Sequence, residues 1–255
     1  MAPASFGAHP RRVAIIGGGP GGYVAAIKAA QLGGEVTLIE KGPLGGVCLN
    51  AGCIPTKVLL HTAKAFETAR DGLAIGLRAE NVSVDWPALM ERKKAVVDTL
   101  VGGVGTLMAS NGVTVLRGEG RLLSPKEVSV ALAGGGATTV QADGVILASG
   151  SEPVIPPVPG FNLEGVITST EALSLEGLPA SAVIVGGGVI GMEFAGLLSS
   201  LGVKVTVVEM LPEILPMFDG EIVAVLKGSL ERKGVTFHTS SKVTGVEREG
   251  RHLAV

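Results

Sequence analysis

The 255-residue sequence predicts an α/β fold in which two modules each have a central parallel sheet and a small β-meander lies between them. Two observations predict this fold. A short apolar strand, a glycine-rich turn, a helix and a second strand follow one another near the start of the chain, and the same order returns in its second half. Strands that alternate with helices are typical of parallel sheets, because each helix carries the chain back to start the next strand.

The first module begins with a buried strand at 12–16, a glycine turn at 17–22, a helix at 23–32 and a second strand at 36–40. Its turn has the G-x-G-x-x-G spacing at Gly17, Gly19 and Gly22. Glycines at these positions permit a tight turn, let backbone N–H groups approach a pyrophosphate, and allow close helix packing. Glu40 ends the second strand about twenty residues further on, where an acid can accept hydrogen bonds from ribose hydroxyls. This segment therefore predicts a dinucleotide-binding module.

The second module repeats the pattern with a strand at 182–185, a glycine turn at 186–191, a helix through 201 and a strand at 205–208. Its fingerprint glycines are Gly186, Gly188 and Gly191, and Glu209 takes the place of the first acid. Glycines could merely break loops in a glycine-rich chain, but here both complete copies also end in an acid. Because no arginine directly follows Glu209, a free ribose 2′-hydroxyl is favoured over a 2′-phosphate. The second nucleotide is expected to be NAD.

The region between the modules predicts a helix from about 86 to 110 and strand-like runs at 113–116, 127–132 and 140–148, with a hairpin at 134–136. Prolines at 151–160 favour an extended, stiff segment. We therefore expect a flexible tail at 1–11, a first domain at 12–150, a linker at 151–160 and a second domain at 161–255. A further hairpin is expected around Gly250.

Cys48 and Cys53 are the only cysteines of the chain. With no further thiol and no histidine pair nearby, they supply too few ligands for a tetrahedral zinc site, so no metal is expected. An ideal helix would place them on different faces, but Asn50, Gly52 and Pro55 permit a distorted turn between them. The spacing leaves two interpretations open: a redox-active pair beside a redox cofactor, or two buried, inert thiols.

Charge and hydropathy exclude two classes of partner. The formal net charge is −2, and the short basic clusters lack the interleaved aromatic residues of a nucleic-acid surface. No apolar run approaches the length of a membrane span. We expect a soluble, cytoplasmic protein that binds neither nucleic acid nor membrane.

Three segments, 17–26, 45–57 and 186–195, resemble the FAD-dependent pyridine nucleotide-disulfide oxidoreductases of class I, and the resemblance covers nearly all of the chain from Arg12 onward. Leu49-Asn50 and the run 54–57 look more like the members that oxidise dihydrolipoamide than like glutathione or mercuric reductase. The resemblance implies two Rossmann-like FAD/NAD(P)-binding modules, with the C-terminal dimerisation domain of the family absent from this chain.

The resemblance also implies roles for particular residues. Cys53 would lie nearer the flavin as the thiolate, and Cys48 would exchange with a dithiol substrate through a mixed disulfide. Lys57 would place a cation beside the flavin, with Glu193 as its partner, although an exposed lysine and a solvated helix acid are the ordinary alternatives. Further cofactor-binding positions implied by the resemblance are Gly45, Gly46, Gly120, Gly150, Ile190 and Val243.

The activity implied is oxidation of dihydrolipoamide, with FAD and NAD as cofactors. The implied partners are lipoyl domains of 2-oxo acid dehydrogenase or glycine cleavage complexes and, in the full-length parent, a second subunit. The family's His-x-x-x-x-Glu pair is absent: His9, His61, His238 and His252 have no glutamate at that spacing. Loss of a general base commonly costs about 10²–10⁴-fold, so we expect the isolated chain to be poorly active and the sequence to be a fragment. Another disulfide reductase of the family and a non-catalytic FAD/NAD-binding module remain as alternatives.

Overall fold

The structure is a computed structural model, and it describes residues 11–255. The expected tail at 1–11 lies, apart from Arg11, outside the described residues. The chain forms two compact units, one reaching up to Pro55 and continuing from Lys94 to Glu152, the other containing Thr56–Lys93 and Pro153–Val255. The last change of unit falls inside the expected linker, whereas the grouping of 56–93 with the second unit was not expected from sequence. The assignment of domains to nucleotides stays a prediction.

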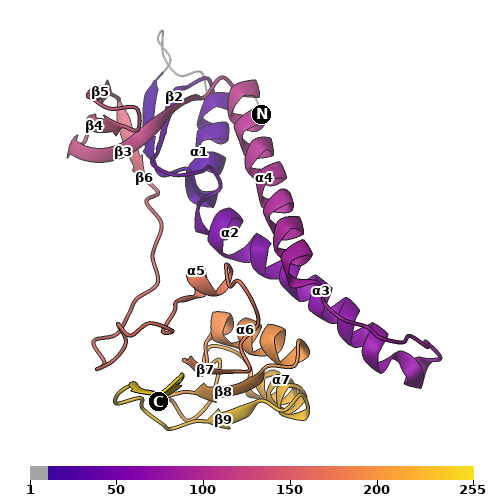
Figure 1. The fold of residues 1–255 in the computed structure, drawn as a ribbon. Helices are drawn as coiled ribbons and strands as arrows, with labels where there is room; N and C mark the ends of the chain where they lie inside the picture. Colours follow the sequence, from indigo (N-terminus) through magenta and orange to yellow (C-terminus); the bar gives the residue numbers. More distant parts are fainter. Residues whose placement is uncertain (1–10) are drawn as a thin grey trace. The chain divides into compact units, whose positions relative to one another are not determined.

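The first unit contains one six-stranded sheet in the order β5-β4-β3-β2-β1-β6 (Figure 1). Its strands are β1 (Arg12–Ile16), β2 (Glu35–Glu40), β3 (Thr114–Ser124), β4 (Glu127–Leu132), β5 (Ala137–Gln141) and β6 (Gly144–Leu147). β1 pairs in parallel with β2 and β6, and the first part of β3 pairs in parallel with β2. From Gly118 onward β3 pairs with β4 in antiparallel register, and β4 pairs likewise with β5. The predicted parallel sheet and β-meander are both confirmed.

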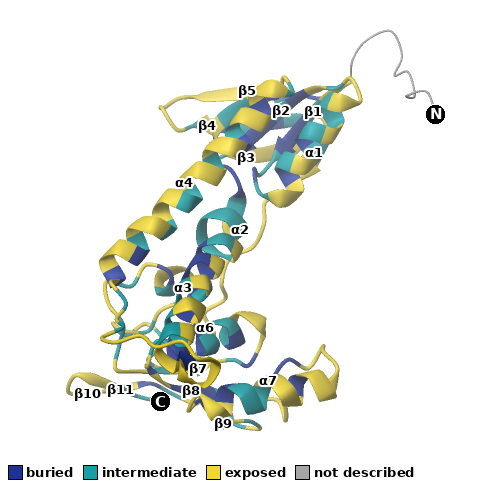
Figure 2. Cartoon of the chain, turned by 90° about the vertical axis from the view of Figure 1, so that its right-hand side faces the viewer, coloured by how far each residue is buried: buried dark blue, intermediate teal, exposed yellow. Residues whose placement is uncertain are grey.

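The central strands β1 and β2 are buried on both faces, and the strand alternation decides which residue faces which layer. Ile15 and Leu38 pack with α1 (Pro20–Gln31) and with the end of α4 (Trp86–Ser110), where Met108 is buried. Their strand neighbours Ala14 and Ile39 face the other side and pack with the buried Val128 and Val130 of β4. Figure 2 colours parts of β1 and β2 as buried. The meander therefore covers one face of the parallel strands and the helices cover the other.

Several predicted boundaries are wrong: the strand expected at 113–116 continues to Ser124 as β3, and two others differ for reasons that the structure shows. The helix expected from Tyr23 starts at Pro20, because proline is preorganised for the first helical position and lacks the N–H that a helix start leaves unpaired. The run expected to form one strand at 140–148 is divided between β5 and β6. These two strands lie at opposite edges of the sheet, so the chain leaves the meander near Asp143, whose N–H donates to the carbonyl of Arg12.

The second unit contains a parallel sheet in the order β7-β8-β9, with β7 (Ser181–Val185), β8 (Lys204–Val208) and β9 (Thr236–His238). α6 (Val189–Ser200) and α7 (Gly220–Arg232) pack with it around buried Met192, Val207 and Leu230. A hairpin of β10 (Glu247–Glu249) and β11 (His252–Ala254) confirms the turn expected around Gly250. The capped short helix α5 (Ser169–Ala172) precedes the sheet.

Two long helices complete the chain between the modules. α2 (Gly46–Ala51) leads into α3 (Cys53–Asp71), which is followed by the 3₁₀ turn η1 (Gly72–Ile75) and by α4. Within the second unit, Trp86 at the start of α4 donates its indole N–H to the carbonyl of Leu175 at 2.9 Å. In the part of the chain that the structure describes, no helix is long and apolar enough to cross a membrane.

Candidate functional site

The two glycine turns are held by the same backbone hydrogen bonds. The Gly17 N–H donates to the carbonyl of Ile39 at 2.8 Å, and the Gly186 N–H donates to the carbonyl of Val208 at 2.9 Å. Each turn is thereby fastened to the end of the neighbouring strand, with Gly19 capping α1 and Gly188 capping α6 in the same extended conformation. The internal repeat seen in the sequence is therefore a structural repeat, with each turn placed before the N-terminus of a helix.

Glycine is required in these turns for two separate reasons. Gly17 and Gly186 have φ values of +108° and +109°, which other residues rarely adopt. A Cβ at Gly22 would lie 1.7 Å from the Gly17 carbonyl oxygen, and one at Gly191 would lie 2.3 Å from that of Gly186. No side chain fits at either place, so the helix must pack directly on the turn.

Glu40 and Glu209 organise the loops around the two turns. The Gly18 N–H donates to Glu40 Oε2 at 2.6 Å and the Gly42 N–H to Oε1 at 2.7 Å. In the second unit the N–H groups of Gly187 and Leu211 donate to Glu209 at the same two distances. Each carboxylate oxygen has a further lone pair, so both acids can still accept a ribose hydroxyl. The acids predicted to bind ribose therefore also shape the turn.

The residues present fit two nucleotide pyrophosphates. Each turn exposes bare backbone in front of a helix N-terminus, where the unpaired N–H groups and the helix dipole favour an anion. In the first unit Gly45 and Gly46 add to this surface: a Cβ at Gly46 would meet the Cα of Gly19 at 2.6 Å. The Gly45 N–H donates to the Gly18 carbonyl at 2.8 Å, so the segment 45–46 lies directly against the turn at 18–19.

The cysteine segment contains the distorted turn that the sequence predicts. α2 ends at Ala51 and α3 begins at Cys53, with Gly52 between them in a non-helical conformation. A Cβ at Gly52 would approach the Cα of Cys48 to 3.3 Å, so the backbone here folds back closely onto the first cysteine. Cys48 is half-buried and Cys53 is exposed, which differs from two thiols packed in a core. The role of the two cysteines as a reactive pair stays a prediction.

Lys57 and Glu193 meet although 136 positions separate them in sequence. Lys57 lies one turn after Cys53 on α3, and its Nζ donates to Glu193 Oε1 on α6. Both residues belong to the second unit, and their side chains are 60% and 28% exposed. The predicted pairing is present, and the amine remains accessible to a ligand.

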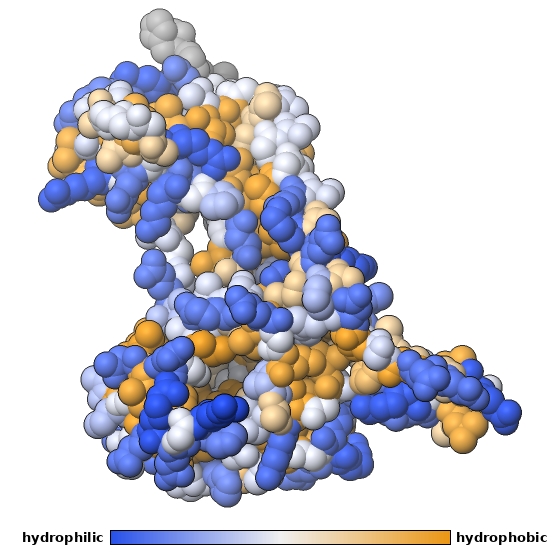
Figure 3. Space-filling view, in the orientation of Figure 1, coloured by the Kyte–Doolittle hydropathy of each residue, from blue (hydrophilic) through white to orange (hydrophobic). Residues whose placement is uncertain are grey.

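The other predicted cofactor positions lie in different surroundings. Gly120 is on β3, where a Cβ would lie 3.1 Å from the side chain of Ile39. Gly150 follows β6 with a φ of +76° and open space around it. Ile190 is exposed at the start of α6. Apolar side chains are visible on the surface of this unit in the lower part of Figure 3. Val243 is half-buried in a segment that starts beside Glu209, whose carbonyl accepts from the Ser241 N–H at 2.9 Å.

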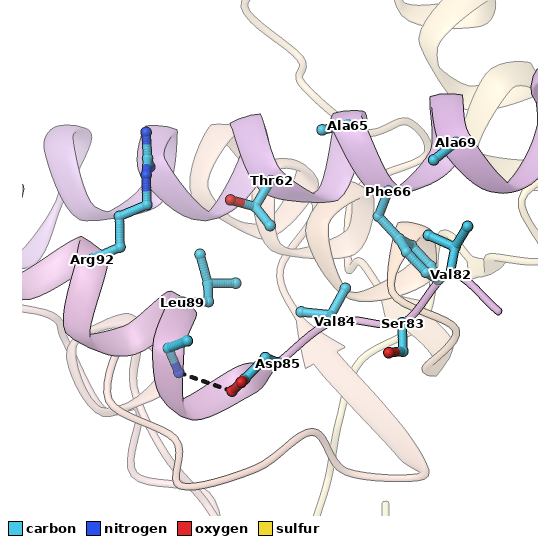
Figure 4. Close-up of a pocket in the computed structure, with 11 residues that line it drawn as sticks. Thr62, Ala65, Phe66, Ala69, Val82, Ser83, Val84, Asp85, Leu89 and Arg92 are labelled. Carbon is cyan, nitrogen blue, oxygen red and sulfur yellow. Dashed lines mark hydrogen bonds between the residues drawn. The ribbon is translucent and has the colours of Figure 1, made fainter. Parts of the chain in front are cut away.

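Two hollows of the second unit contain none of the predicted residues. One, of about 400 Å³, lies between α3, the start of α4 and the segment 82–85, with Phe66 and Leu89 in its apolar lining (Figure 4). The other, of about 640 Å³, is polar and includes Glu67 and Lys233, which form an ion pair. Sequence reasoning missed this pair, because no motif links residues so far apart. Residues 11–255 contain no group of three or more His, Cys, Asp or Glu placed to hold a metal ion.

Comparison with known proteins agrees with this geometry. The family model described as pyridine nucleotide-disulphide oxidoreductase matches residues 11–255. The chain belongs to this family. Enzymes of the pyridine nucleotide-disulphide oxidoreductase family are FAD-dependent disulfide oxidoreductases and use FAD and NAD.

Individual relatives in this family cover the chain almost completely. A dihydrolipoyl dehydrogenase of Acholeplasma laidlawii is 44% identical over 92% of this chain and 70% of its own length. Another from Bacillus subtilis is 45% identical over 94% of this chain and 52% of its own length. The HOCl-induced flavoprotein disulfide reductase RclA from Escherichia coli has a similar structure, with a TM-score of 0.81, 28% identity, and 95% and 52% of the two chains covered. The chain thus spans about half the length of two of these three proteins.

Proposed function

We propose that this chain performs the chemistry of a dihydrolipoyl dehydrogenase, and that it does so slowly when isolated, because it contains no His-x-x-x-x-Glu pair. Dihydrolipoamide and NAD⁺ would give lipoamide, NADH and a proton, so that two electrons leave the substrate dithiol and one disulfide forms in it. Bound FAD would supply the two-electron relay between the cysteine pair and NAD. The observation that carries the proposal is the placement of Lys57 one turn after Cys53, with its amine bonded to Glu193 at the start of the second nucleotide module.

The cysteine pair would take the electrons from the substrate. A substrate thiolate attacks Cys48 of the Cys48–Cys53 disulfide, forms a mixed disulfide with it, and releases Cys53 as a thiolate. The second substrate thiol then displaces Cys48, which leaves the substrate oxidised and both cysteines reduced. Cys48 suits the attacked position because a kink at Gly52 separates it from α3, while Cys53 is fixed at the start of that helix.

The two turns would hold the two nucleotides. The first turn, with Gly45 and Gly46 beside it, would receive the FAD pyrophosphate, and Glu40 would bind its ribose. The second turn and Glu209 would do the same for NAD. Gly120 and Gly150 would contribute to the flavin site, and Ile190 and Val243 to the NAD site. Lys57 would hold a positive charge beside the flavin, with Glu193 fixing its direction.

Lipoyl domains of 2-oxo acid dehydrogenase or glycine cleavage complexes are the proposed source of the dithiol, and the proposal includes a homodimer and a cytoplasmic location. The structural similarity to RclA favours a second candidate function, in which this chain, as another member of the same family, reduces a disulfide other than lipoamide.

The test is to load the chain with FAD and to measure NADH oxidation with lipoamide, glutathione disulfide or cystine as acceptor. Faster oxidation with lipoamide supports the proposal. Preference for another acceptor supports the second candidate. A chain that binds FAD but oxidises no NADH with any acceptor, even when a single turnover is measured, contradicts both candidates.

A further inference from the structure

The far end of α3 is joined to the second nucleotide module by a partly buried group of charges. Lys233, directly after α7, places its Nζ 2.6 Å from Glu67 Oε1 on α3 and 3.0 Å from Ser200 Oγ at the end of α6. The Glu67 side chain is 12% exposed, and Ser200 is buried. Three helices therefore meet at one polar cluster, which we call the Glu67 clamp: Glu67, Ser200 and Lys233.

The surroundings of Glu67 favour its charged form. Burial acts most strongly on the pKa of Glu67 and raises it, but hydrogen bonds from Lys233 and Ser200, with the charges of Lys233 and Lys64, outweigh burial and lower the pKa overall. Lys233 also lies at the C-terminal ends of α6 and α7, where helix dipoles favour a cation. The carboxyl group of Glu67 is thus ionised at neutral pH.

The clamp lies on the same helix as Lys57, ten positions further along. At about 1.5 Å of rise per residue, the two attachment points of α3 are roughly 15 Å apart. An exposed ion pair such as that of Lys57 with Glu193 is a weak constraint by itself. A helix held at one weak point can rotate about it, whereas one held at two points has a fixed direction.

We propose that Glu67 is a positioning residue, which holds α3 through Lys233 and Ser200 so that Lys57 stays on Glu193. This inference rests on the proposed function, because it gives the Lys57 amine a task beside the flavin. Loss of the Glu67 charge releases the far end of α3, and the Lys57 amine then samples several positions. The chemistry slows even though Glu67 itself contacts no reacting atom.

The first arm of the test measures the chemistry. In the FAD-loaded chain, Glu67→Gln is expected to reduce the rate constant of flavin reduction by NADH about tenfold, within the roughly 10²-fold that a 1 Å misplacement costs. Lys57→Met in the Glu67→Gln background is expected to add little further loss, since both changes disturb the same group. The charge exchange Glu67→Lys with Lys233→Glu is expected to restore most of the rate.

Two controls separate positioning from general damage. Asp98→Asn breaks the exposed pair of Lys94 with Asp98 on α4 and is expected to leave the rate unchanged. Ser200→Ala removes one hydrogen bond of the clamp and keeps its ion pair, so this variant replaces Glu67→Gln if the latter unfolds. It is expected to reduce the rate constant of flavin reduction by less than Glu67→Gln does. The inference would be overturned if Glu67→Gln and Ser200→Ala both reduced flavin at the wild-type rate. It would also be overturned if the rate of the double variant Glu67→Gln with Lys57→Met fell by the full product of the two single losses.

The second arm needs no cofactor. Amide hydrogen exchange at the start of α3 is expected to accelerate in Glu67→Gln relative to Asp98→Asn, and the coupling of Lys57 with Glu193 in a double-mutant cycle of thermal unfolding is expected to shrink. Unchanged exchange and coupling contradict the clamp. If the wild-type chain shows no flavin reduction while this arm succeeds, the proposed function fails and the positioning of Lys57 stands.

Discussion

Replacing Glu209 by glutamine tests whether the acids at the strand ends have the double task that the structure indicates. Glu209 is 8% exposed and accepts N–H groups of Gly187 and Leu211 at 2.6 and 2.7 Å. Glutamine has one acceptor oxygen, so one of these donors must face an NH₂ group. A hydrogen bond to a charged group contributes about 1.5–3 kcal/mol. We expect a loss of about 2 kcal/mol in the free energy of unfolding of the second unit, or roughly 4–8 °C in Tm.

The same change should weaken NAD binding, because the ribose loses its charged acceptor. A further 1.5–3 kcal/mol corresponds to a Kd raised roughly 10–100-fold. The assays are thermal unfolding by circular dichroism and isothermal titration with NAD, with flavin retention measured in parallel. Glu40→Gln is the matched control: it has the same two backbone bonds and should impair flavin retention while leaving NAD affinity unchanged. An unchanged Tm together with an unchanged NAD affinity in Glu209→Gln would show that Glu209 neither holds the turn nor binds the ribose.

Three further substitutions test other parts of the structure. Gly22→Ala should abolish flavin retention, because its Cβ would lie 1.7 Å from a backbone oxygen of the turn; flavin fluorescence after gel filtration measures this, and normal retention contradicts it. Gly102→Ala should stabilise the chain by about 0.5–1 kcal/mol, since it is in the interior of α4 with open space around it; denaturant titration checks the sign. The pKa of Glu67 is lowered from 4.5 despite burial, through bonds and charges of Ser200, Lys233 and Lys64. The contribution of Glu67 to stability should therefore be complete above its pKa in the unfolded chain and lost as the pH falls through its lower pKa in the folded chain. Glu67→Gln should flatten this loss of Tm at acid pH in thermal unfolding. The same loss of Tm in both proteins would contradict a lowered pKa of Glu67.

Sequence reasoning succeeded where the signal is local. The turns at Gly17 and Gly186 depend on residues within about thirty positions, and the strand, turn and helix order is repeated in both copies. The pairing of Lys57 with Glu193 was found through the family resemblance rather than through spacing, and the structure contains it. The cofactor contacts and catalytic roles remain predictions, since they concern groups outside the chain.

Other features could not be read from sequence because they depend on distant partners. The run 140–148 has the residues of one strand, and only the pairing of β5 with β4 and of β6 with β1 divides it. Likewise, nothing near Glu67 indicates Lys233, since the two meet only after α3 packs on the second sheet's helices. These contacts also explain why residues 56–93 belong to the second unit.

The sequence also gave no sign that Glu40 and Glu209 hold the glycine turns through backbone hydrogen bonds. Sequence spacing predicts a ribose ligand at Glu40, but its bonds to Gly18 and Gly42 follow from the loop conformation and not from residue type. The need for glycine at position 18 could likewise not be predicted from the motif. A Cβ there would meet the side chain of Glu40 at 3.1 Å, a constraint that the G-x-G-x-x-G spacing does not include.

In the proposed reaction, Cys48 and Cys53 pass the electrons of a dithiol to the flavin. The most direct test is an anaerobic titration of the FAD-loaded chain with dihydrolipoamide, followed by visible absorption, in wild type, Cys48→Ser and Cys53→Ser. The titration measures an end point, so slow exchange does not obscure it. In wild type, a long-wavelength thiolate-to-flavin band is expected to grow with added dithiol. The band is expected before titration in Cys48→Ser and at no point in Cys53→Ser. A wild-type flavin spectrum that stays unchanged in excess dihydrolipoamide would show that the cysteine pair does not pass electrons to the flavin.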